Sequence, residues 1–393
     1  MCVAQVLVQI GAYAWPALLP TFMGAWQLDN SDAGWITGIF YAAYTLAVPF
    51  LVSLTDRVDP KRVYLIGVAT TATAHFGFVF VADGFWSAMV ARALAGIGWA
   101  GTYMTGLKLL ADRVSGRLME RAVAGHAAGV GIAGAMSFIV ADALARQWGW
   151  QTAFSVAGAC AIAAFALILV VAPWQAARKP AAARPPLLDF KPVIRNRAAM
   201  AYAVGYCVHT WEMSALRGWA VAFLGYVATT TSADAMWLTP AAVTTLTALL
   251  GTAASVSGNE IAIARGRARM VRVTMIVSML CGAVIGFLGM VDYNLAVALV
   301  VLWGILIWLD SSTLTGGTTM HAQPERRGAT LAVHSMLGYA GGFVGPLVVG
   351  WTLDLMGGMS RAGWGVAFAS TALAVLCGRI AFGYLVGTAR GSR

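Results

Sequence analysis

An apolar stretch at residues 198–225 carries three ionisable side chains, His209, Glu212 and Arg217. His209 and Glu212 are three positions apart, so on a helix they share a face and lie close enough to hydrogen-bond. A carboxyl group beside an imidazole in an apolar setting is typical of a proton relay. Arg217 projects from another side of the helix, so it needs a helix break or a partner on another segment. The alternative is a structural Glu–Arg pair that pins two helices together.

Two further charges lie inside apolar stretches. Asp310 precedes a run of hydroxyl residues at 311–313 and is a candidate partner for Arg217 or Arg92. Arg92 lies in the stretch 85–110, where a charge must face a cavity or an acidic partner unless it extends to the membrane surface. The candidate proton-coupling residues are Glu212, His209, Asp310 and Arg92.

Aromatic and polar side chains in other apolar stretches are candidates for contact with a solute. Tyr and Trp also gather at membrane interfaces, and a single buried His is more often satisfied by a structural hydrogen bond, so both interpretations stay open. The candidate substrate-binding residues are Arg217, Tyr13, Trp15, Trp211, Tyr339, His334 and Ser311. The arginines favour an anionic solute, whereas Glu212 and Asp310 would suit a cation equally well.

The composition places these residues in a membrane protein. Of 393 residues, 60% are hydrophobic and 11% are charged, and the mean hydropathy is +0.75. These values exclude a soluble enzyme, a disordered chain and a secreted disulfide-linked domain. The net charge of +10 comes from basic residues in short loops between apolar stretches. This pattern indicates a lipid bilayer with an anionic inner surface rather than nucleic acid as a partner.

Motifs for catalysis and cofactor binding are missing from the sequence. No phosphate-binding P-loop, HExxH, CxxC or GxSxG pattern occurs, and the five cysteines are scattered. We therefore expect no enzymatic activity, no cofactor, no metal site and no ATP-driven transport in this chain.

Twelve apolar stretches are long enough to cross a bilayer, which needs about 20 residues per helix. They are 3–25, 33–54, 63–82, 85–110, 122–145, 151–173, 198–225, 236–257, 271–290, 293–319, 329–355 and 364–387. We predict an all-α integral membrane protein with an N-terminal six-helix bundle at 1–173, a linker at 174–197 and a C-terminal six-helix bundle at 198–393.

Most of the 26 Lys and Arg residues gather in alternate loops. By the positive-inside rule, we expect both termini and the linker 174–197 to lie on the cytoplasmic side of a bacterial inner membrane. Asp142 and Asp354 then lie near outer helix ends, where we interpret them as caps or gates.

Two loops share an order of acidic residue followed by basic cluster, one at 54–62 and one at 258–269. In addition, Arg92 precedes a Gly-x-Gly pattern at 96–98. These features resemble signatures of the major facilitator superfamily, although Val52 and Asp59 replace two of its usual glycines. A pair of loops that merely follow the positive-inside rule is the alternative. The candidate gating residues are Asp56, Arg57, Arg62, Glu260, Arg265 and Arg267.

The resemblance covers essentially the whole chain and implies twelve transmembrane helices in two pseudo-symmetric six-helix bundles. It implies a secondary active transporter that moves a small solute, such as an organic or inorganic anion, by alternating access coupled to protons. A multidrug or metabolite exporter of the same fold, acting as a proton antiporter, is the alternative, and a receptor, channel or enzyme is the least favoured. We expect a monomer whose partners are its solute, protons and lipids.

The amino-acid pattern of the stretches 198–225, 293–319 and 329–355 is similar to the pattern in permeases grouped with nitrate/nitrite and cyanate porters. Nitrate porters hold their anion with arginines in the second and eighth helices. This chain has no arginine in 33–54 or 236–257, so nitrate itself is not the expected solute.

Overall fold

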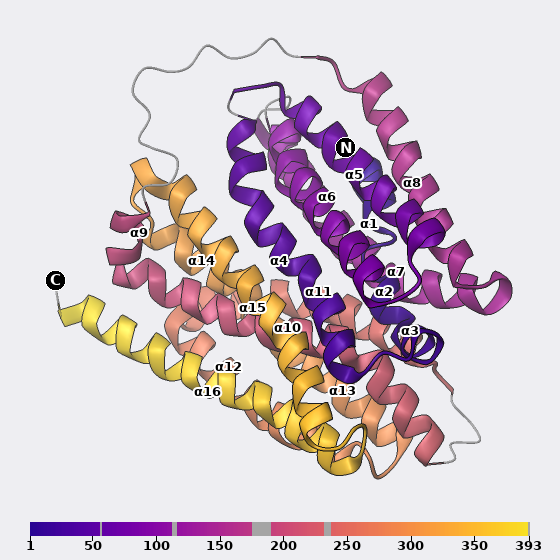
Figure 1. Ribbon diagram of the computed structural model, residues 1–393. Helices are drawn as coiled ribbons and strands as arrows, with labels where there is room; N and C mark the ends of the chain where they lie inside the picture. The colour runs from indigo at the N-terminus through magenta and orange to yellow at the C-terminus, as the bar shows by residue number, and fades with distance from the viewer. Residues whose placement is uncertain (56, 112–115, 175–189, 232–236, 392–393) are drawn as a thin grey trace. The chain divides into compact units, whose positions relative to one another are not determined.

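The computed structural model describes residues 1–393 apart from 56, 112–115, 175–189, 232–236 and 392–393. Within this part of the chain every regular element is a helix (Figure 1). Nine helical segments of the described residues are long and apolar enough to cross a membrane. These observations confirm the predicted all-α membrane fold.

The described residues form two compact units. Unit 1 comprises Met1–Leu28 and Ile39–Arg184, and unit 2 comprises Asp29–Gly38 and Pro185–Arg393. The predicted N-terminal bundle, 1–173, included residues 29–38, which the structure groups with unit 2.

Unit 1 begins with three short helices in place of the single crossing predicted at 3–25. Pro16 and Pro20 lack the backbone N–H that a continuous helix needs. Gly11, in the first turn between these helices, lies so close to the His75 ring that an added Cβ would be only 2.6 Å from it. The helices of unit 1 are α1 (Cys2–Gln9), α2 (Ala14–Ala17), α3 (Leu19–Trp26), α4 (Asn30–Leu54, which starts in unit 2), α5 (Pro60–Val81), α6 (Phe85–Ala111), α7 (Gly116–Trp148) and α8 (Trp150–Val171).

The loop that precedes α5 ties two helix ends together. Asp59 caps α5, because its carboxylate accepts a hydrogen bond from the Lys61 backbone N–H at 2.9 Å. The Lys61 ammonium is buried and donates to the carbonyl oxygens of Leu169 (2.8 Å) and Ala172 (2.5 Å) at the end of α8. A cation is favourable there because helix C-termini carry partial negative charge.

Unit 2 contains a broken membrane helix. The predicted crossing at 293–319 is divided between α13 and α14, with Leu309 and Asp310 at the break. Gly258 faces this break, and an added Cβ there would overlap the carbonyl oxygen of Leu309. The helices of unit 2 are α9 (Lys191–Arg195), α10 (Arg197–Thr230), α11 (Pro240–Arg265), α12 (Arg267–Leu288), α13 (Tyr293–Trp308), α14 (Ser311–His321), the 3-10 helix η1 (Pro324–Arg326), α15 (Arg327–Leu355) and α16 (Arg361–Gly391).

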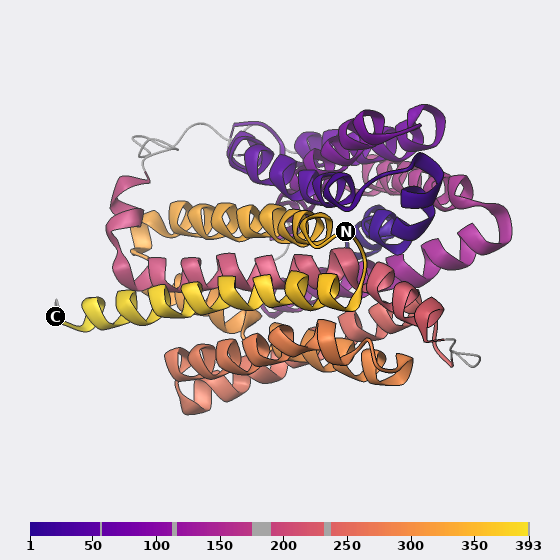
Figure 2. The same cartoon turned by 60° about the horizontal axis from the view of Figure 1, so that its bottom comes forward.

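The long helix α10 lies between α15 and α16, as both ribbon views show (Figures 1 and 2). Gly341 and Gly345 of α15 face the carbonyl oxygens of Cys207 and Trp211 on α10, leaving no room for a Cβ at either glycine. Small residues at such positions let helix backbones approach closely, which is how membrane helices pack.

The start of α4 is held in unit 2 by Asp354, near the end of α15. The Asp354 carboxylate accepts hydrogen bonds from the backbone N–H (3.2 Å) and side-chain amide (2.7 Å) of Asn30. It also accepts from the backbone N–H (2.7 Å) and hydroxyl (2.5 Å) of Ser31. Asp354 thereby caps the N-terminus of a helix that lies far away in the sequence.

Candidate functional site

Glu212 lies at the meeting point of three helices of unit 2. Its side chain, on α10, is 3% exposed. One carboxylate oxygen accepts a hydrogen bond from the Trp303 indole on α13 at 2.7 Å, and the other accepts from the Ser278 hydroxyl on α12 at 3.1 Å. Both donors are neutral, so the charge of an ionised Glu212 would be solvated by dipoles rather than by a cation.

A second buried acid, Asp310, lies at the break between α13 and α14. Its Oδ1 is 3.0 Å from Nδ1 of His209, and both side chains are buried. The spacing of the sequence suggested His209 as the neighbour of Glu212, and the structure places it against Asp310. His209, Glu212, Ser278 and Asp310 line one narrow gap between the helices, so the two carboxyl groups lie at the same place in the packing.

A stack of rings extends from this pair. Tyr206 lies between His209 and His334, with ring centroids 5.6 Å and 4.0 Å away and nearly parallel planes. The two ring nitrogens of His334 are 3.0 Å and 3.2 Å from the hydroxyls of Thr318 and Thr315 on α14. The hydroxyl residues after Asp310 therefore fix the His334 ring.

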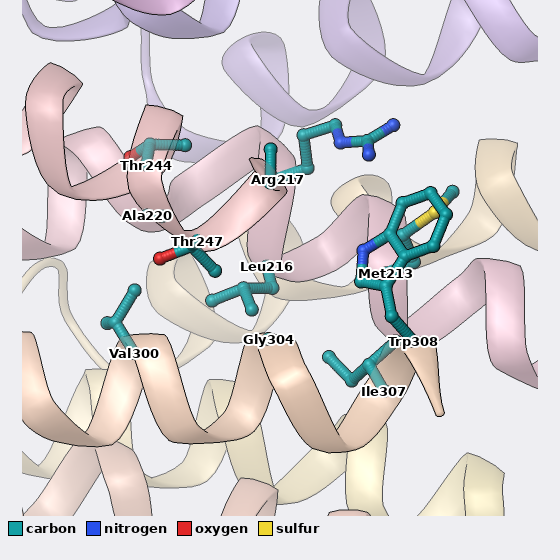
Figure 3. A pocket seen from close by; sticks show the side chains of 11 residues that line it. Met213, Leu216, Arg217, Ala220, Thr244, Thr247, Val300, Gly304, Ile307 and Trp308 are labelled. Carbon is teal, nitrogen blue, oxygen red and sulfur yellow. The ribbon is translucent and has the colours of Figure 1, made fainter. Parts of the chain in front are cut away.

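Arg217 lines a larger pocket in unit 2, of about 360 Å³, between α10, α11 and α13 (Figure 3). The carbon of its guanidinium is 5.3 Å from the centroid of the Trp308 ring, a cation–π contact. Arg217 is the one charged residue among those that line the pocket. Trp308 is thus one contact of Arg217 on another segment, and α10 continues without a break.

The rest of this pocket is mostly apolar. The hydroxyls of Thr244 and Thr247 donate to carbonyl oxygens of their own helix, both at 2.8 Å. Gly304 lies against the methyl group of Thr247, and a Cβ at this position would overlap it. The pocket combines one cation, one indole face and apolar walls, which is the usual composition of a small-molecule site.

The other predicted substrate residues are spread over both units. Trp211, Ser311 and Tyr339 are half-buried in unit 2, and the Trp211 indole N–H is buried without a hydrogen-bond partner. In unit 1, Trp15 is fully buried and stacks on Phe22 at 5.0 Å. Tyr13, also in unit 1, stacks on Phe138 at 5.4 Å.

The remaining predicted residues lie elsewhere. Arg92 is buried in unit 1, whereas the other predicted coupling residues belong to unit 2. Asp56 lies outside the described residues. Arg57, Glu260 and Arg265 are exposed. Arg62, also exposed, lies 6.0 Å from the Trp174 ring centroid, and Arg267 donates to the side chain of Asn259 at 2.8 Å.

Sequence reasoning missed three residues of the site: Ser278, Trp303 and Trp308. Each is a side chain with a hydrogen-bonding group in an apolar crossing, and such groups need partners there. This requirement could have marked Ser278 and Trp303 as residues with a buried partner, but it does not identify the acidic residue that they contact. Among the described residues, no cluster of three or more His, Cys, Asp or Glu side chains could hold a metal ion.

Comparison with protein families gives a match over most of the chain. The model described as Major Facilitator Superfamily matches residues 1–346. Human protein spinster homolog 1 is 23% identical over 235 residues, which are 57% of this chain and 44% of that protein. The niacin transporter NiaP of Acinetobacter baylyi is 22% identical over 151 residues, 38% of this chain and 34% of that protein. The chain thus spans less than half the length of these curated relatives.

Solved structures share the fold along almost the full chain. A bacterial homolog of the human lysosomal transporter Spinster, in an inward-facing and occupied conformation, has a TM-score of 0.75 at 14% identity, covering 98% of this chain and 95% of that one. The nucleoside transporter NupG has a TM-score of 0.75 at 15% identity, covering 98% of both chains.

Proposed function

The chain belongs to the major facilitator superfamily of membrane transporters, and we propose that it is a secondary active transporter of a small organic anion, coupled to protons. The family and the apolar helices make it a multi-pass protein of the lipid bilayer that acts on a small-molecule solute. In our proposal it lies as a monomer in a bacterial inner membrane, with both termini in the cytoplasm, and works by alternating access.

The Arg217 pocket carries the proposal for the solute. A guanidinium offers parallel N–H groups that match a carboxylate, and Arg217 places one beside Trp308 at the edge of the pocket. The apolar walls suit the hydrocarbon part of the same molecule. A small aromatic or aliphatic carboxylate satisfies both features. The relative named as a niacin transporter fits this class, since niacin is an aromatic carboxylate.

Glu212 carries the proposal for coupling. A buried carboxylate without a cation is costly, so this side chain favours the protonated form while its surroundings stay dry. Water that enters the narrow gap in another conformation would favour release of the proton. In this scheme the neighbouring His209–Asp310 pair tunes Glu212.

A proton-driven exporter of organic cations is the second candidate. The observation that favours it is that Glu212 and Asp310 line one narrow gap between the helices, because two neighbouring carboxyl groups would attract a positively charged solute once the gap opens. Loss of protons from these groups would then accompany binding of the cation.

Counterflow in proteoliposomes tests the transporter function and separates the two solute classes. Vesicles loaded with unlabelled nicotinate or benzoate should transiently accumulate the labelled compound from outside, with saturable initial rates. Tetraphenylphosphonium, a lipophilic cation, should show no protein-dependent counterflow. Counterflow of the cation alone would support the exporter, and protein-dependent uptake without saturation or counterflow would contradict a carrier.

A further inference from the structure

Unit 1 contains a small pocket that the proposed transport scheme leaves unused. Its walls are mostly apolar, it has room for a particle about the size of a water molecule, and it is lined by side chains of α1, α4, α5 and α6, among them Gln9, Phe40, His75 and Trp99. All four of these side chains are buried. The pocket therefore lies within the helical packing of this unit rather than at its lipid-facing surface.

Gln9 presents an unused hydrogen-bond donor at this pocket. Its side chain is 3% exposed, and its amide nitrogen has no hydrogen-bond partner. A buried donor without a partner is destabilising, so a ligand that accepts a hydrogen bond from Gln9 would be favoured. His75 lines the same space, and a neutral imidazole adds one further N–H donor.

Arg92 lies directly behind the wall of the pocket. Its guanidinium is 4.5 Å from the ring centroid of Phe40 and 3.4 Å from the carbonyl oxygen of Ala12, and both of these residues line the pocket. The arginine is 4% exposed and its Nε has no partner. Within the described part of the chain no carboxylate pairs with it. A buried cation without an acid is strongly unfavourable, and an anion nearby would relieve it.

We propose that this pocket binds one small monovalent anion. The amide nitrogen of Gln9 and a ring nitrogen of His75 donate hydrogen bonds to the anion, and Arg92 supplies the balancing charge. The anion is a free halide, an acceptor with a single negative charge that is small enough for this space. The site belongs to unit 1 and does not depend on the solute proposed for the Arg217 pocket of unit 2.

Thermal unfolding of the full-length protein in detergent tests this site. Chloride is titrated against gluconate, an anion too bulky for the pocket, at constant ionic strength. Binding to the folded state should raise Tm by roughly 2–4 °C, and the rise should saturate. Equilibrium dialysis with radiolabelled chloride measures binding directly.

The chain offers a matched control on the same helix. Gln5 is also buried with an unpartnered amide nitrogen, but it does not line the pocket. Gln9→Leu should abolish the anion-dependent rise in Tm and the bound radiolabel, whereas Gln5→Leu should keep both. A saturable rise in Tm together with bound chloride supports a resident counter-ion at this site. Equal Tm values in chloride and gluconate without bound radiolabel, or an equal loss in the two variants, would overturn the proposal.

Discussion

At the scale of single residues, the two central charges of unit 2 are accommodated in different ways. Arg217 lies over the face of Trp308 and lines a mostly apolar pocket. Glu212 is enclosed by the neutral donors Trp303 and Ser278, so its charge is available only to a proton or to water that enters. These environments favour recognition of the solute as the role of Arg217 and proton coupling as the role of Glu212.

Replacement of Arg217 separates its geometry from its charge. Arg217→Lys keeps the charge but loses the paired N–H groups, so we expect KM for a carboxylate solute to rise about tenfold with little change in maximal rate. Arg217→Met, which loses both, should raise KM further. Initial rates of uptake into proteoliposomes measure both quantities. A fall in maximal rate at unchanged KM would assign Arg217 to the conformational change instead of to recognition.

The site residues themselves could be predicted only in part. Glu212, His209, Asp310 and Arg217 stand out in the sequence because ionisable side chains are rare in apolar crossings. Their partners do not stand out. His209 faces Asp310 rather than Glu212 because a helix break on another segment brings Asp310 to it, and spacing along α10 carries no information about that break.

At the scale of elements, glycine decides how closely the helices of unit 2 approach. Most helix positions could be predicted from hydropathy, as for α10, which was expected at 198–225 and extends over Arg197–Thr230. The interruption between α13 and α14 could not, because it depends on Gly258 of α11 making room for the carbonyl oxygen of Leu309. In the divided first crossing, Gly11 of the first turn likewise lies against the His75 ring.

The seam between α10 and α15 provides a direct test of this packing. A methyl group at Gly341 would overlap the carbonyl oxygen of Cys207, so Gly341→Ala should destabilise the protein by about 1–3 kcal/mol. Gly225 of α10 has open space around it, and Gly225→Ala should stabilise by up to about 1 kcal/mol through helix propensity. Unfolding in detergent measures both variants. Equal stability of the two would show that the seam is looser than described.

At the scale of the whole molecule, the distribution of basic residues predicts which loops lie in the cytoplasm. We expect a cysteine introduced at Ile194, an exposed residue of the linker, to be protected from an impermeant thiol reagent in intact cells. A cysteine at Asp83, in the exposed turn between α5 and α6, should react readily. Both variants require a background without the five native cysteines. Labelling at position 194 together with protection at position 83 would show that the protein has the opposite orientation in the membrane.

Proton coupling through Glu212 is the central claim, and solute accumulation driven by an imposed pH difference measures it most directly. Glu212→Gln retains the size of the side chain and removes its titrating group, while the amide can still accept from Trp303 or Ser278. We predict that proteoliposomes with this variant exchange solute across the membrane largely as the parent protein does, but no longer accumulate it in response to the pH difference. Accumulation by the variant equal to that of the parent would contradict the account and favour a structural role for Glu212.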